Sequence, residues 1–121
     1  MDVTAENYLS ILKDEFEAGD ASFLIKLRPG LEWDKDAFAR LISAMQMFCE
    51  QRRKSEVVEY WLAQGFWFVP GFVREWSSHP DFPRVHPRGY YEEAYRRLDD
   101  LARWFFMGES PYSGGKGFEP M

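Results

Sequence analysis

The apolar residues between Tyr91 and Phe105 recur at the spacing of one helix face, and this pattern constrains the fold more than any other feature. An α-helix turns once every 3.6 residues, so side chains three and four positions apart lie on the same side. Gly108 follows the pattern, and glycine commonly ends helices because it adopts the left-handed conformation readily. The sequence therefore predicts a helix that ends at Gly108. Its apolar face comprises Tyr91, Ala94, Tyr95, Leu98, Leu101, Ala102 and Phe105.

The opposite face of this helix is predicted to be solvated. It carries acids four residues before bases, the order that stabilises a helix by about 0.2–0.5 kcal/mol for each pair. The predicted pairs are Glu92–Arg96, Glu93–Arg97 and Asp99–Arg103.

A second stripe predicts a helix that Asp34 caps. A side-chain oxygen at the N-cap accepts a hydrogen bond from a main-chain N–H in the first turn, which suits aspartate. The stripe comprises Phe38, Leu41, Ile42, Met45, Phe48 and Cys49.

Two shorter helices are predicted before Asp34. The first is capped by Thr4 and stopped by Gly19, and the second is capped by Asp20 and stopped by the turn at 28–30. Their apolar positions are Leu9, Leu12 and Phe16 in the first helix, and Phe23, Leu24 and Leu27 in the second.

The segment from Tyr60 to Phe82 is rich in aromatic residues, but its apolar residues do not follow one clear helical or strand spacing. Ser55 is predicted to cap a helix that Gly65 stops, with a single helix over 35–64 as the alternative. Residues 66–90 hold four prolines and are predicted to be irregular. Within them, Pro70 is suited to the first turn of a short helix, and 66–69 to a buried strand-like segment.

These patterns predict an all-α protein, a compact single-domain bundle of about five helices over 1–108. Residues 109–121 are predicted to be a flexible tail, with packing of Tyr112 and Phe118 against the body as the alternative. No apolar run approaches the roughly 18 residues that a membrane helix needs. The start lacks a secretory signal, and a single cysteine forms no internal disulfide framework. We therefore expect a cytoplasmic protein, with an exported chain that has lost its signal as the alternative.

The net charge of −5 lies at the amino-terminal end. Residues 1–36 contain nine acids and four bases, whereas 37–108 contain nine acids and ten bases. An acidic surface attracts basic partners and repels nucleic acid, although modest acidity also serves solubility alone. The acids of this region that we interpret as candidate partner contacts are Asp14, Glu15, Glu17, Asp20, Glu32, Asp34 and Asp36.

Residue types that carry chemistry do not form a catalytic or metal-binding motif. Cys49 falls on an apolar stripe, which favours a buried structural cysteine over a nucleophile. His79 and His86 with Asp81 match no common ligand spacing, and we expect each imidazole to bond loop backbone. We therefore expect no cofactor, no metal and no enzymatic activity. Nucleic-acid binding through arginines among the aromatics is disfavoured by the net charge.

Large rings at a surface are typical anchors of protein interfaces. Most aromatic residues are expected in the core, with one or two of Trp67, Phe68, Phe72 and Trp76 remaining exposed. We take Trp67, Phe72 and Trp76 as further candidate partner contacts.

The final helix and the acidic residues of 1–36, which we call the acidic front, together resemble a known class of protein. The resemblance is carried by Tyr90-Tyr91-Glu92-Glu93-Ala94-Tyr95 through Trp104-Phe105-Phe106 and by the ending Gly108-Glu109-Ser110-Pro111-Tyr112. In these residues the chain resembles the small immunity proteins that bacteria make against contact-dependent or polymorphic toxins. The resemblance implies a role, binding and neutralising one toxin, and assigns no site residue.

Three hypotheses follow. The first is a protein-binding module of the immunity type, whose acidic front meets a basic toxin domain. The second is a small-ligand-binding protein or enzyme with a pocket lined by Trp67, Trp76, His79 and His86. The third is a self-associating subunit, which would form a homodimer.

Overall fold

The computed structural model describes residues 2–52 and 57–111, and within these residues all regular structure is helical. The prediction of an all-α bundle of five helices is confirmed. The helices are α1 (Tyr8–Phe16), α2 (Phe23–Leu27), α3 (Lys35–Gln51), α4 (Tyr60–Ser77) and α5 (Arg88–Met107).

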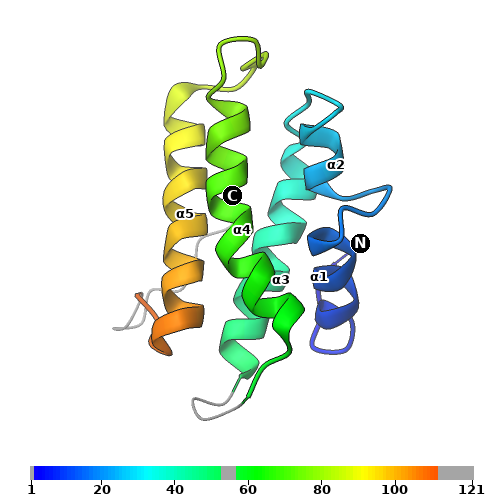
Figure 1. Cartoon of the computed structure of the whole chain (residues 1–121), viewed down its shortest axis with the longest axis vertical. Coiled ribbons are helices and arrows are strands. Elements are labelled where there is room, and N and C mark those ends of the chain that lie inside the picture. The colour runs from blue at the N-terminus through cyan, green and yellow to red at the C-terminus, as the bar shows by residue number, and fades with distance from the viewer. Residues whose placement is uncertain (1, 53–56, 112–121) are drawn as a thin grey trace.

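The long helices α3, α4 and α5 run in alternating directions, and α4 lies beside α5 (Figure 1). The short helices α1 and α2 follow one another along the other flank, where both contact α3 and α4. This layout places the seam between α1 and α4 on the side of the molecule away from α5.

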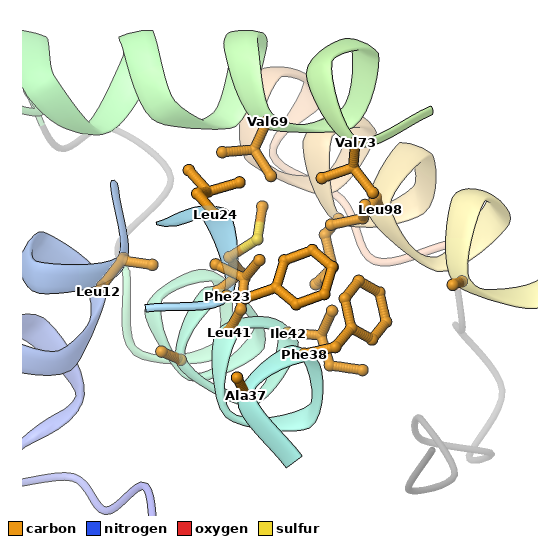
Figure 2. Close-up of a cluster of buried hydrophobic side chains, with 14 of the residues drawn as sticks. Leu12, Phe23, Leu24, Ala37, Phe38, Leu41, Ile42, Val69, Val73 and Leu98 are labelled. Atoms are coloured by element: carbon orange, nitrogen blue, oxygen red, sulfur yellow. The ribbon is translucent and has the colours of Figure 1, made fainter. Parts of the chain in front are cut away.

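One cluster of buried hydrophobic side chains holds the bundle together, and every helix contributes to it. Phe23 of α2 and Phe38 of α3 pack ring against ring, with centroids 5.1 Å apart, beneath Val69 and Val73 of α4 (Figure 2). Trp33, which precedes α3, adds its ring at 4.8 Å from Phe23. Edge-to-face aromatic pairs of this kind stabilise a core beyond the area they bury.

Helices α3 and α5 form where the periodic stripes predict them. All six stripe residues of α3 are buried. Asp34 is the N-cap, and its Oδ1 accepts the Ala37 N–H at 3.0 Å. Gly108 ends α5 in the left-handed conformation, at φ 77°, and its N–H bonds the Trp104 carbonyl at 2.8 Å.

The boundaries of α1 and α2 differ from the predicted ones by a few residues. Ala18, rather than Gly19, takes the left-handed position after α1, at φ 56°. The Ala18 and Gly19 N–H groups bond the Glu15 and Asp14 carbonyls, which is the Schellman arrangement. Ser22, rather than Asp20, caps α2 and accepts the Ile25 N–H at 3.2 Å. The difference at α2 arises because Ser22 offers a hydroxyl cap two residues after Asp20.

Helix α4 corrects the prediction of an irregular segment over 66–90. It continues through Gly65 and Pro70 to Ser77, so only residues 78–87 are irregular. Pro70 leaves the Phe66 carbonyl without its helical N–H donor, at a cost of about 3 kcal/mol. Burial outweighs this cost, because each fully buried large apolar side chain contributes about 1.5–3 kcal/mol. The buried residues of α4 include Leu62, Phe66, Val69 and Val73.

The separation of α3 from α4 also excludes the single helix over 35–64. Residues 52 and 57–59 are not helical, so the chain breaks between the two helices. The predicted cap Ser55 and the predicted tail contacts of Tyr112 and Phe118 lie outside the described residues.

The polar face of α5 is paired differently from the prediction. Glu93–Arg97 forms, with 3.6 Å between the charged atoms, but Arg97 is buried rather than solvated. Glu92 pairs with Arg88 at 3.0 Å, one turn earlier than predicted. Asp99 reaches Arg74 of α4 at 2.6 Å in place of Arg103. Tertiary contacts therefore choose the partners of this face.

Candidate protein-binding surface

An aromatic stripe follows one side of α4, and we call it the α4 stripe. Its members are separated by four, three, four and four residues, which keeps them within one quarter of the helix circumference. The Phe68 and Phe72 rings stack at 4.9 Å, and Trp76 follows Phe72 at 6.3 Å. The stripe consists of Trp61, Gly65, Phe68, Phe72 and Trp76.

The α4 stripe lies at the edge of the core and stays partly open to solvent. Phe68 is 45% exposed, whereas Trp61, Phe72 and Trp76 are half-buried. The Arg28 guanidinium, which follows α2, lies 3.8 Å from the centre of the Trp76 ring and covers that end. Trp61 at the other end meets Phe16 of α1 edge to face at 6.2 Å.

A hollow of about 330 Å³ opens beside this stripe, between the end of α1 and the middle of α4. We call it the α1–α4 groove. Gly65 permits its shape, because a Cβ there would lie 2.1 Å from Cδ2 of Phe16. The groove is lined by Phe16, Glu17, Trp61, Gln64, Gly65, Phe68 and Val69.

A second hollow, of about 460 Å³, lies on the other side of Trp61. Lys13 lines it and places its ammonium group 5.8 Å from the centre of the Trp61 ring. The indole N–H of Trp61 donates to Glu59 at 2.7 Å. Trp61 therefore separates this hollow, whose charged lining residues are Lys13, Arg52 and Glu59, from the groove, whose lining includes Glu17.

Glu15, one of the predicted partner contacts, is a structural residue. Its side chain is 1% exposed and accepts the Phe23 N–H at 2.9 Å. Arg40 of α3 approaches the same carboxylate at 3.4 Å. Burial raises the pKa of Glu15 above its ordinary value, although the Phe23 N–H and Arg40 oppose the rise. This carboxylate joins α1, α2 and α3 and does not reach the surface.

Asp34 also has an internal role, because it caps α3 and pairs with Lys26 at 2.6 Å. The hydrogen bond from Lys26 lowers the pKa of Asp34. The other five candidate acids are exposed, and none of them forms an ion pair with another described residue. They are Asp14, Glu17, Asp20, Glu32 and Asp36.

The five exposed acids do not all face the same hollow. Glu17 lines the α1–α4 groove, whereas Asp36 lines a different hollow together with Asp2 and Arg40. The structure therefore connects the acidic front with the aromatic residues at Glu17.

The acids of α5 contrast with these five. Glu92, Glu93 and Asp99 all form ion pairs with arginines of α4 or α5. Three acids of α5 are therefore compensated, whereas the five exposed acids of the α1–α3 region form no ion pair with a described residue.

The residues of the predicted ligand pocket do not converge. Trp67 and Trp76 are nine positions apart on α4, which turns them to opposite sides of the helix. Trp67 is 74% exposed. His79 Nδ1 accepts the Asp81 N–H at 3.1 Å, and His86 Nε2 lies 3.3 Å from the Trp33 carbonyl oxygen. Both imidazoles thus contact backbone, as predicted.

Cys49, Arg74 and Arg84 make contacts within the fold. Cys49 is buried as predicted, and burial raises the pKa of its thiol to about 12. Arg84 donates to the Ser77 carbonyl at 3.0 Å and to the Tyr95 hydroxyl at 2.6 Å. Together with the Arg74–Asp99 pair, these contacts engage two of the arginines considered for nucleic-acid binding.

Phe16, Trp61 and Gln64 form part of the groove but were not predicted as contact residues. A helical period over 61–76 would have placed Trp61, Phe68, Phe72 and Trp76 on one side. Gly65 and Pro70 interrupt that reading of the sequence. The approach of Phe16 depends on the packing of α1 against α4, for which the sequence carries no local signal.

Comparison of the chain with known protein families, with characterised proteins and with solved structures gave no match. Each described helix is either too short or too polar to cross a lipid bilayer. Over residues 2–52 and 57–111, no three histidine, cysteine or acidic side chains gather closely enough to hold a metal ion. Function is therefore inferred from the surface just described.

Proposed function

We propose that this protein is a non-enzymatic binding module of the immunity type, which binds and neutralises a basic toxin domain. The observation that carries the proposal is the set of five exposed acids without ion pairs, which adjoins open aromatic rings at Glu17. Such charges accelerate association with a basic partner, and buried aromatic anchors slow its release. The resemblance of the final helix to bacterial immunity proteins supports the same role.

The experiment is a protection assay in cells that express a toxin encoded beside this protein. We expect the intact protein to restore growth and to form a complex with the purified toxin domain. Loss of protection is expected for Glu17→Lys/Asp20→Lys, because that variant places two cations where the basic toxin must approach. If the intact protein neither protects nor binds, the proposed function is wrong.

The matched control is Asp81→Lys/Glu92→Lys, which makes the same change in net charge outside the acidic front. Both side chains are exposed, so the control should remain folded and should still protect. Equal loss of protection in the two variants would show that total charge, and not the acidic front, determines binding.

A further inference from the structure

The α1–α4 groove has the size and lining of a site for one large side chain. Its volume of about 330 Å³ is at the lower end of the range of ligand pockets. Phe16, Trp61 and Phe68 provide aromatic walls, and Phe68 remains 45% exposed. A hydrophobic side chain that entered the groove would cover these rings, and rings of this kind dominate the energy of protein interfaces.

The groove has a negatively charged residue, Glu17, at one end. Glu17 is exposed, lines the groove and forms no ion pair with a described residue. Lys13, one helical turn earlier, lies instead toward the second hollow on the other side of Trp61. A cation on a bound segment is therefore attracted at the Glu17 end, whereas at the Trp61 end the opposite charges of Lys13 and Glu59 offset one another. Gln64 also lines the groove, and its side-chain amide has both a donor and an acceptor for the peptide groups of a bound segment.

We propose that the α1–α4 groove receives a large apolar side chain of a partner protein, from a segment in which lysine or arginine neighbours that side chain. The occupant follows from charge complementarity with Glu17 and from the aromatic walls. The proposal rests on the proposed function in one respect, since it identifies the chemistry by which a basic partner is held.

Short peptide probes test this proposal without the toxin. The probe is acetyl-Trp-Arg-amide, titrated into ¹⁵N-labelled full-length protein and followed by nuclear magnetic resonance. We expect the Trp61 indole and Gln64 side-chain amide signals to shift with a common Kd. Acetyl-Trp-Glu-amide should bind about fivefold more weakly because repulsion replaces attraction. Acetyl-Ala-Arg-amide should also bind about fivefold more weakly because the apolar anchor is missing.

Two variants locate the binding site. Phe68→Ala removes an open groove wall and should weaken the Trp-Arg probe about fivefold or more. Glu17→Lys should remove the preference for Trp-Arg over Trp-Glu and, being a surface change, should fold normally. Trp67→Ala is the control, because its ring is more exposed than that of Phe68 but does not line the groove. Equal affinity for Trp-Arg and Trp-Glu, or equal effects of Phe68→Ala and Trp67→Ala, would overturn the proposal.

The outcome can be separated from that of the proposed function. If the groove binds the probes but the protein protects against no toxin, the groove proposal is supported and the proposed function is wrong. If the protein protects but the groove does not bind the probes, the proposed function is supported and the groove proposal is wrong. The other possible occupant of the groove is a second copy of this chain, which sedimentation tests. A dimer that Phe68→Ala dissociates would show a second copy in the groove and overturn the proposal.

Discussion

Gly65 is the residue on which the close approach of α1 to α4 depends. The Phe16 ring lies where a Cβ of residue 65 would be and contacts the Trp61 and Phe66 rings edge to face. An added Cβ at residue 65 would lie 2.1 Å from Cδ2 of this ring, so the ring would have to shift from its present contacts. Glycine at this position is thus required by packing, although it weakens the helix itself.

We predict that Gly65→Ala lowers the free energy of unfolding by about 1–3 kcal/mol, because overpacking outweighs a gain of about 1 kcal/mol in helix propensity. Gly71→Ala is the matched change in the same helix. No atom lies within 4 Å of its added Cβ, so this variant should be stabilised by up to about 1 kcal/mol. Urea denaturation measures both values. Stabilisation by both changes would contradict the packing of Phe16 against α4.

Glu15 predicts an unusual dependence of stability on pH. Its pKa is raised in the folded protein, so over the pH range just above 4.5 the folded state binds more protons at this site than the unfolded state. The contribution of Glu15 to stability therefore increases as the pH falls. Glu15→Gln loses this titration, and we expect its destabilisation relative to the parent to be smallest at pH 7 and larger at pH 5.

Urea denaturation at the two pH values measures this difference. Glu17→Gln, an exposed change at the same helix end, should cost less than about 0.5 kcal/mol. A cost of Glu15→Gln that shrinks toward low pH would show that the hydrogen bonds to the carboxylate outweigh its burial.

At the scale of elements, α5 is a helix whose two faces have unequal roles. Leu98 is fully buried, whereas Arg103 is exposed. Arg97 belongs with the core side despite its charge, because its side chain is buried beside Glu93. The stem of an arginine packs like an apolar chain, so position alone does not make it a surface residue.

We predict that Leu98→Asp unfolds the protein. A buried, unpaired carboxylate costs several kcal/mol, which is comparable to a typical total stability of about 5–15 kcal/mol. Circular dichroism should show loss of most helical signal at 25 °C. Arg103→Ala should change the free energy of unfolding by less than about 0.5 kcal/mol. Equal effects of the two substitutions would contradict the orientation of α5.

At the scale of the whole molecule, unpaired negative charge and open aromatic rings meet along the α1–α4 seam. Glu92, Glu93 and Asp99 of α5 form ion pairs with arginines, whereas the exposed acids at the end of α1, Asp14, Glu17 and Asp20, form none with a described residue. An uneven field of this kind steers a charged partner toward one side of a protein.

We predict that Asp14→Lys/Glu17→Lys/Asp20→Lys slows association with the basic partner and weakens the dependence of its rate on salt. The dissociation rate should change less, since rim charges act mainly on encounter. Phe68→Ala should show the opposite pattern, with faster dissociation and nearly unchanged association. Stopped-flow fluorescence at two salt concentrations separates the two rates. If the triple charge reversal leaves the association rate unchanged, these acids serve solubility alone.

The sequence by itself determined α3 and α5, with the Asp34 cap and the Gly108 stop, because stripes and caps depend on residues a few positions apart. Tertiary structure decided α4, where burial overrides the local cost of Gly65 and Pro70. It also decided which acids remain at the surface. Glu15 follows Ile11 by four positions and Leu12 by three, so it shares their side of α1, where the Phe23 N–H and Arg40 meet its carboxylate, while Glu17 lies on another side and stays exposed at the groove. Such contacts join residues distant in the chain, and no local pattern encodes them.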